Sequence, residues 1–150
     1  MAKPLKVGLR QGAGPHTGYL WSVHYLSVAR LEAGCFLDDG QYAHTVDLFR
    51  ALASETDPTH PTTVNVEAIE EFFELKDKGG ILGKINLRVF FIVNAKEKAI
   101  VVLGAIKKEA DGQTPMWVKI RIRNRLRRLR AGEFGNLDTT RSARGKRTKE

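Results

Sequence analysis

Two strongly hydrophobic runs that lie close together, residues 85–93 and 99–106, limit the possible folds of this chain more than any other feature. Both are rich in Val, Ile and Phe, and both have the length of a strand rather than that of an ordinary helix. The polar residues 94–98 between them make a connector of hairpin length. The pattern predicts an antiparallel hairpin, and because each run is almost continuously apolar, we expect other elements to cover most of both faces.

Basic residues mark the ends of this hairpin, and one basic residue lies inside it. Lys76 and Lys78 precede the first strand, and Lys107 and Lys108 end the second. Cations at strand ends are usually solvated. Arg88, in contrast, lies within the first apolar strand, where a charge is unfavourable unless it is paired or faces a cleft. Arg88 is therefore a candidate functional residue.

Length and composition indicate one globular domain, because 150 residues with 42% hydrophobic content can bury a sizeable core. No apolar run is long enough to cross a membrane, and residues 1–18 lack the apolar core of a secretory signal. A single cysteine excludes a disulfide framework and a cysteine-based metal site. We therefore predict a cytoplasmic protein with a flexible segment at 1–18, one domain at 19–130 and a disordered basic tail at 131–150.

The positive charge is concentrated near the C-terminal end. Residues 114–150 hold 12 Lys and Arg against 3 Asp and Glu, whereas residues 1–113 hold 13 against 14. A localised basic segment attracts phosphate backbones. Nucleic acid is therefore the favoured partner, ahead of an anionic membrane or a purely solubilising role.

The N-terminal half carries strand and helix signals in turn. Residues 19–25 have the aromatic and β-branched composition of a strand. Residues 26–36 predict a short helix interrupted near its glycine, and a second helix is expected over about 41–53, with Asp38 or Asp39 as its cap. Two helices joined by so short a turn form a helical hairpin that can cover one face of a sheet.

Residues 64–74 carry contradictory signals. Residues 72–75 could begin a strand, whereas four acidic residues would share one face of a helix: Glu67, Glu70, Glu71 and Glu74. This acidic face is most simply solvated. A second interpretation is that it balances the basic C-terminal segment across the fold.

Thr114 and Pro115 predict the start of a terminal helix, with Thr114 as the N-cap and Pro115 at the first position. An apolar stripe with helical spacing follows, which we interpret as core packing; it consists of Val118, Ile122, Leu126 and Leu129. Basic side chains without one acid occupy the other faces, which favours a nucleic-acid contact over an ordinary surface helix. We expect nucleic acid to contact Lys107 and, on this helix, Lys119, Arg121, Arg123, Arg125, Arg127 and Arg128.

The order of several short segments is more distinctive than any one of them. An aromatic-Glu-Leu-Lys segment at 72–76 is followed by an Arg-led apolar segment at 88–91, an apolar segment ending in two lysines at 100–108, and Thr114-Pro115. This order resembles the RelE/HigB type of toxin from bacterial toxin–antitoxin pairs. The resemblance is specific over residues 72–115.

The resemblance implies an α+β fold, in which an N-terminal helical hairpin packs on a small twisted antiparallel sheet and a C-terminal basic helix completes the domain. It also implies cleavage of mRNA on the ribosome, without a metal or other cofactor. In this reaction the 2′-hydroxyl attacks the adjacent phosphate and leaves a cyclic phosphate. A cognate antitoxin protein is the implied partner, besides mRNA and the ribosome, and no membrane partner is expected.

Such a site must remove a proton from the attacking hydroxyl, protonate the leaving oxygen and stabilise the extra negative charge. Carried over by position, Arg88 corresponds to the arginine that binds phosphate and stabilises the transition state. Lys76 or Lys78 corresponds to the base, and Lys108 to the acid or a second phosphate contact. The chain departs from some relatives because it has no Tyr after Tyr42 and no His after His60.

Two alternatives remain open at this point. A protein of the same fold could bind nucleic acid without cutting it, through the basic helix and the tail. A related toxin type inhibits gyrase by protein contact. Fold alone does not distinguish among these functions.

Overall fold

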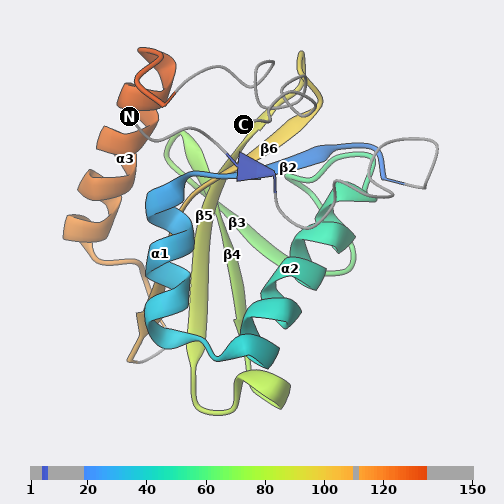
Figure 1. Ribbon diagram of the computed structural model, residues 1–150, viewed down its shortest axis with the longest axis vertical. Coiled ribbons are helices and arrows are strands. Elements are labelled where there is room, and N and C mark those ends of the chain that lie inside the picture. The colour runs from blue at the N-terminus through green and yellow to red at the C-terminus, as the bar shows by residue number, and fades with distance from the viewer. Residues whose placement is uncertain (1–4, 7–18, 110–111, 135–150) are drawn as a thin grey trace.

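The computed structural model describes residues 5–6, 19–109 and 112–134, which fold into an α+β domain with a six-stranded mixed sheet (Figure 1). The elements follow one another as β1 (Leu5–Lys6), β2 (Ser22–Tyr25), α1 (Ser27–Phe36), α2 (Asp39–Ala53), β3 (Asn65–Ile69), β4 (Phe72–Lys78), the 3₁₀ turn η2 (Gly80–Leu82), β5 (Asn86–Asn94), β6 (Ala99–Lys108) and α3 (Met116–Arg130). The rest of the segments expected at 1–18 and 131–150 lies outside the described residues.

The predicted hairpin of two apolar strands is confirmed. β5 and β6 pair antiparallel from Asn94 opposite Ala99 to Asn86 opposite Lys108. Most side chains of both strands are buried, as expected for a hairpin covered on both faces. This hairpin forms the centre of the sheet, whose strand order is β1-β2-β6-β5-β4-β3.

The prediction of a wholly antiparallel sheet is wrong at one junction. β2 pairs parallel with β6, with Ser22 opposite Ala99 and Tyr25 opposite Val102. The two helices that intervene make this crossover possible, because parallel neighbours need a long connection.

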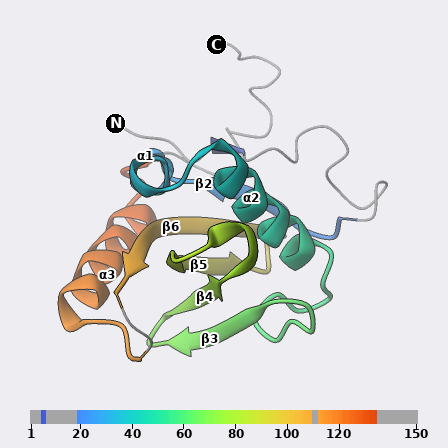
Figure 2. The ribbon, with the colours of Figure 1, turned by 90° about the horizontal axis from the view of Figure 1, so that it is seen from below.

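The helices α1 and α2 follow β2, so the pair is not the N-terminal part of the fold. α1 continues through Gly34 without the predicted interruption. Asp38 is the N-cap of α2, as one of the two predicted alternatives, and forms a reciprocal capping box with Gln41. Figure 2 shows α2 on one side of the sheet and α3 on the other.

Aromatic contacts identify the two faces of the sheet. Phe91 of β5 packs edge-on against Phe49 of α2, with 5.7 Å between ring centroids. Its neighbour Phe90 points to the opposite face, where its ring contacts Phe72 of β4 at 6.0 Å. Gly104, which pairs with Phe90, has Ile122 of α3 directly above it. α3 therefore covers the face of the sheet that α2 leaves open.

The ambiguous stretch 64–74 is a β-hairpin rather than a helix. β3 and β4 pair antiparallel, with Glu67 opposite Glu74 and Ile69 opposite Phe72. Glu70, in the tight turn between them, has φ 53°. The four glutamates that could share a helix face are instead distributed over two strands and a turn.

α3 confirms the predicted apolar stripe, because Val118, Ile122 and Leu126 are buried. The predicted cap is wrong. Pro115 is the N-cap residue, and the helix begins at Met116. The side chain of Thr114 turns into the interior, where its hydroxyl donates a hydrogen bond to the carboxylate of Glu74.

The fold continues past α3 into residues 131–134. Phe134 is buried, and its ring lies 4.8 Å from the guanidinium of Arg128. None of the helices in the described part of the chain has both the length and the apolar composition of a membrane span.

Candidate functional site

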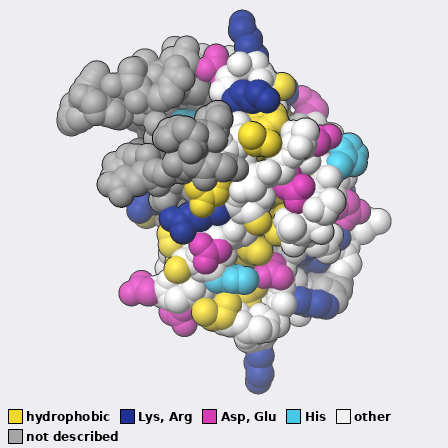
Figure 3. All heavy atoms as spheres, turned by 90° about the vertical axis from the view of Figure 1, so that its right-hand side faces the viewer, with side chains coloured by type: hydrophobic (Ala, Val, Ile, Leu, Met, Phe, Trp, Pro, Cys, Tyr) yellow, Lys and Arg dark blue, Asp and Glu magenta, His cyan; other side chains and the backbone are white. Residues whose placement is uncertain are grey.

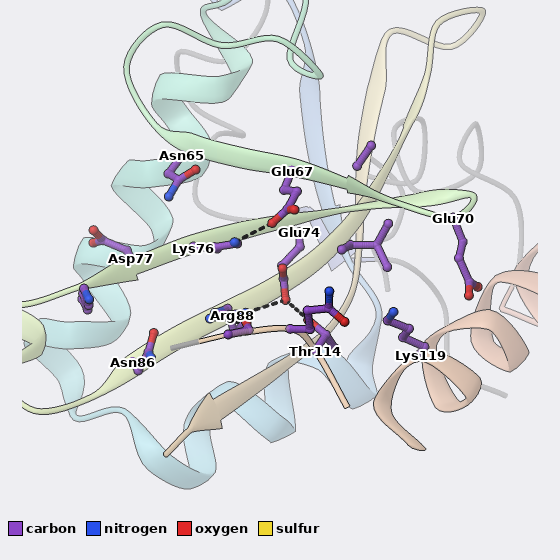
Figure 4. Close-up of a pocket in the computed structure, with 15 residues that line it drawn as sticks. Asn65, Glu67, Glu70, Glu74, Lys76, Asp77, Asn86, Arg88, Thr114 and Lys119 are labelled. Carbon is purple, nitrogen blue, oxygen red and sulfur yellow. Dashed lines mark hydrogen bonds and ion pairs between the residues drawn. The ribbon is translucent and has the colours of Figure 1, made fainter. Parts of the chain in front are cut away.

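An open cleft of about 700 Å³ lies on the α3 side of the sheet, between β3, β4, β5 and the start of α3 (Figure 4). Four cations line it: Lys76 and Lys78 of β4, Arg88 of β5 and Lys119 of α3. Three of these are predicted catalytic residues, and the fourth is a predicted RNA contact. The structure therefore brings together residues that are up to 43 positions apart in the sequence.

The strand register explains this convergence. Lys76 lies opposite Asn65 of β3 on one side and opposite Arg88 of β5 on the other. The next row on the same face contains Lys78, Asn86 and Lys108. Side chains directly opposite one another on a sheet lie within contact distance. Lys108, the fourth predicted catalytic residue, therefore lies on the same face but one strand beyond the residues that line the cleft.

Arg88 is both paired and part of the cleft wall, which meets each condition expected for a charge inside an apolar strand. Its Nη1 donates to Oε2 of Glu74 at 3.1 Å, and its Nη2 donates to the carbonyl of Gly112 at 3.2 Å. The same Glu74 oxygen accepts the hydroxyl of Thr114. Arg88 is 2% exposed and Glu74 is 1% exposed. Its charge is therefore largely neutralised, and it connects the sheet to the segment that precedes α3.

Lys76 forms a different kind of ion pair at the centre of the cleft. Its Nζ lies 2.5 Å from Oε1 of Glu67, and both side chains are partly exposed. The hydrogen bond from Lys76 is the main cause that lowers the pKa of Glu67, and the charges of Arg88 and Lys119 lower it further. Glu67 is therefore an anion held among three cations.

Lys119 extends from the first turns of α3 into the cleft (Figure 4). Its ammonium group makes no ion pair with another residue that the structure describes. Glu70, which also lines the cleft, is already bound through three hydrogen bonds to the guanidinium of Arg123. Lys119 is the cleft cation least committed to the fold.

Most of the arginines on α3 pair with acids from other elements. The pairs are Arg121 and Arg125 with Glu32 of α1, Arg123 with Glu70, Arg130 with Glu71, and Arg128 with Glu133. Two of these acids belong to the turn between β3 and β4, so the interpretation that this acidic stretch balances the basic helix is correct for Glu70 and Glu71. Among the predicted RNA contacts, Lys107 and Arg127 are exposed and form no ion pair with another described residue.

The side of the sheet that α2 covers carries a different kind of contact. His44 of α2 pairs with Asp77 of β4 at 2.7 Å, on the face of the sheet that α2 covers. Figure 3 shows this side of the molecule, where acidic and basic side chains are interspersed. Within the ranges that the structure describes, no group of three or more His, Cys, Asp or Glu side chains is arranged to hold a metal ion.

Sequence reasoning missed the polar residues that surround the cations. Glu74 and Thr114 fix Arg88, and Glu67 fixes Lys76. A period-two pattern places Asn65 and Glu67 on one face of a strand. This pattern is the sequence signal that could have identified these two residues as part of the cleft. The same glutamates also fit a helix, so the pattern alone did not decide between the two structures.

Comparison with known proteins adds no relative. No family model matches the sequence, and neither a curated protein nor a solved structure shows significant similarity to it. The residues of the cleft are therefore the basis for inferring a function.

Proposed function

We propose that this chain is the toxin of a toxin–antitoxin pair and cleaves mRNA in the cytoplasm as a metal-independent, RelE/HigB-like endoribonuclease, acting on the ribosome. One observation carries the proposal: three cations predicted from the resemblance line a single open cleft together with Lys119. A phosphodiester entering this cleft would meet cations from two strands and a helix. Such an arrangement suits the extra charge of the transition state.

The roles within the cleft follow from exposure and pairing. Lys76 and Lys78 are the candidates for the group that, as a neutral amine, accepts the proton of the 2′-hydroxyl. Lys119 would bind the phosphate from the opposite wall. Arg88, which is buried and paired with Glu74, would act by positioning the segment at Gly112–Thr114. Lys108 would protonate the leaving oxygen or contact the next phosphate along the RNA.

The test compares purified wild-type protein with Lys76→Gln and Lys119→Gln on mRNA bound to ribosomes. Lys96→Gln is the matched control, because Lys96 is exposed in the turn between β5 and β6. We expect new RNA ends carrying 2′,3′-cyclic phosphate with the wild type and the control, and a strong loss of cleavage with both cleft variants. Cleavage that persists in Lys76→Gln and Lys119→Gln would contradict the proposed site.

A second candidate function is nucleic-acid binding without cleavage. The extensive pairing of the cleft cations with Glu67 and Glu74 favours it, because paired cations are less available for chemistry. A protein that only binds RNA would produce no new RNA ends at any protein concentration. Its affinity would depend on the exposed cations of α3 and fall steeply with added salt.

Exposed apolar side chains support a protein partner, which we propose to be the antitoxin. Leu31 of α1 is 70% exposed, and Met116, Trp117 and Ile120 of α3 are 59%, 57% and 45% exposed. α1 and α3 lie side by side in Figures 1 and 2, and Glu32 connects them. Exposed apolar groups commonly mark a protein interface where they lie close together, and three of these four lie within five consecutive residues of α3. Trp117→Ala should weaken neutralisation by an antitoxin and leave RNA cleavage unchanged.

A further inference from the structure

The carboxylate of Glu67 lies where three cations of the cleft converge. Lys76 of β4 contacts it directly, with 2.5 Å between Nζ and Oε1. Arg88 of β5 and Lys119 of α3 line the same cleft, and their charges also favour the ionised form of Glu67. Figure 4 shows Glu67 and Lys76 directed toward each other above Arg88. A group with the charge of a phosphate already occupies this position.

The contact between Glu67 and Lys76 is easily broken. The side chain of Glu67 is 55% exposed, and that of Lys76 is 28% exposed. Ion pairs of such exposure contribute little net stability, because water solvates both partners when they separate. β3 is also the edge strand of the described sheet, so no further strand restricts the outward rotation of Glu67. The carboxylate can leave Lys76 without disturbing the core.

Another exposed pair shows what the same contact does outside the cleft. Glu71 lies 2.5 Å from Arg130, and their side chains are 56% and 60% exposed. Glu71 does not line the cleft. Glu67 and Glu71 therefore match in their exposure and in the distance to their cation. They differ because the cation of Glu67 lines the cleft and the cation of Glu71 does not.

We propose that Glu67 fills a phosphate subsite formed by Lys76 and Lys119 beside the buried Arg88, and that it must turn away from Lys76 before a phosphate of RNA binds there. The proposal rests on the proposed function only for the identity of the ligand as RNA. Four acidic side chains, Glu67 among them, balance the four basic side chains that line the cleft, so ionised Glu67 opposes the binding of single anions. An RNA strand with several phosphates can compensate for the repulsion by Glu67, because it also reaches Lys78 and Lys108 in the adjacent row of the sheet. Glu67 thus selects polyanions over small anions.

The test measures binding rather than cleavage. The probe is a fluorescein-labelled 2′-O-methyl RNA decamer, which lacks the attacking hydroxyl, and its Kd is measured by anisotropy at constant salt. We expect Glu67→Gln to bind about tenfold more tightly than the wild type, since a like charge next to the phosphate is removed. Glu71→Gln should change Kd less than about twofold, because its charge is solvated and lies outside the cleft.

A double-mutant cycle identifies the mechanism. In the Lys76→Gln background, Glu67→Gln should produce much less gain in affinity, because the cation that Glu67 competes for is missing. Equal tightening by Glu67→Gln and Glu71→Gln would overturn the subsite and indicate a general charge effect. An unchanged Kd for Glu67→Gln would overturn it as well.

Inorganic phosphate separates this proposal from the proposed function. Phosphate should raise the Tm of Glu67→Gln more than that of the wild type, by preferential binding to the folded state. If the wild type cuts no RNA while this difference is present, the proposed function fails and the subsite stands. If RNA is cut while Glu67→Gln matches the wild type in both binding measurements, the subsite fails and the proposed function stands.

Discussion

Arg88 and Glu74 form an ion pair at 3.1 Å in which both side chains are almost completely buried, at 2% and 1% exposure. They lie on neighbouring strands, and Glu74 also accepts the hydroxyl of Thr114. Arg88 in turn donates to the carbonyl of Gly112. The pair therefore holds the segment that leads into α3 against the sheet, and with it one wall of the cleft.

Removing one member of this pair should destabilise the protein strongly. Arg88→Met leaves the Glu74 carboxylate buried without its cation, which typically costs about 3–5 kcal/mol. Urea unfolding followed by circular dichroism measures this loss. A loss below about 1 kcal/mol would show that water solvates the pair in the folded protein.

The double variant Arg88→Met with Glu74→Met controls for the size of the two side chains. The double variant should lose much less unfolding free energy than the two single variants lose in sum, because no buried charge remains unpaired. This matters for catalysis as well. Any loss of cleavage in an Arg88 variant must be compared with its folded fraction before it is assigned to the chemistry.

Gly104 should not tolerate a side chain. A Cβ atom there would lie 2.7 Å from Nη1 of Arg125 and 2.7 Å from Cδ1 of Ile122. Arg125 cannot yield freely, because it is bound to Glu32 and to the carbonyl of Leu103. Gly104→Ala should therefore destabilise the fold by about 1–3 kcal/mol in an unfolding titration.

Gly34→Ala is the matched control for a glycine-to-alanine change. Nothing lies within 4 Å of the new Cβ, and the residue is within helix α1. Alanine should therefore stabilise the protein by up to about 1 kcal/mol through helix propensity alone. Equal effects of the two substitutions would contradict the close packing of α3 on β6.

The central elements of the fold could be predicted because their patterns, taken over their full length, favour one structure. Residues 85–93 and 99–106 are too short and too apolar for a surface helix, so a buried hairpin was the remaining choice. The stripe of α3 runs for more than three turns, which a strand does not reproduce. Residues 64–74 could not be assigned to helix or strand in this way, because the spacing of their glutamates fits both a helix face and a hairpin.

The partners of the charged residues could not be predicted, because they depend on register. The sequence shows that Arg88 needs an anion or a cleft, and many carboxylates were available. Only the pairing of β4 with β5 and the inward turn of Thr114 select Glu74. For the same reason the α3 arginines seemed unpaired in sequence, since Glu32, Glu70 and Glu71 reach them from distant positions.

Glu55 should make stability depend on pH in the acid range. Its carboxylate accepts hydrogen bonds from the backbone and hydroxyl groups of Thr62 and Thr63, and these lower its pKa in the folded state. The folded protein therefore holds this proton less tightly than the unfolded chain does. The resulting stability is present above the ordinary pKa of glutamate and is lost as pH falls through the lowered one.

A comparison of Tm between wild type and Glu55→Gln over this pH range measures the effect. The wild type should be the more stable protein near neutral pH, and the difference should shrink as the pH becomes acid. Thr63→Val, which removes one donor to Glu55, should move this change to higher pH. A difference in Tm that is independent of pH would show that the Glu55 contacts do not involve its charge.

The cations of α3 should separate into those that the fold uses and those that bind RNA. Arg125 is 11% exposed and bound to Glu32 and the Leu103 carbonyl, so Arg125→Gln should lower stability by about 1–3 kcal/mol. Lys119 has no such partner among the described residues, so Lys119→Gln should change stability by less than about 0.5 kcal/mol. The same Lys119 variant should weaken binding of the 2′-O-methyl RNA and reduce its salt slope by about 1. If Arg125→Gln loses more stability and Lys119→Gln loses more RNA affinity, the charges of this one helix have two separate functions. If Lys119→Gln loses both stability and RNA affinity, Lys119 is structural too.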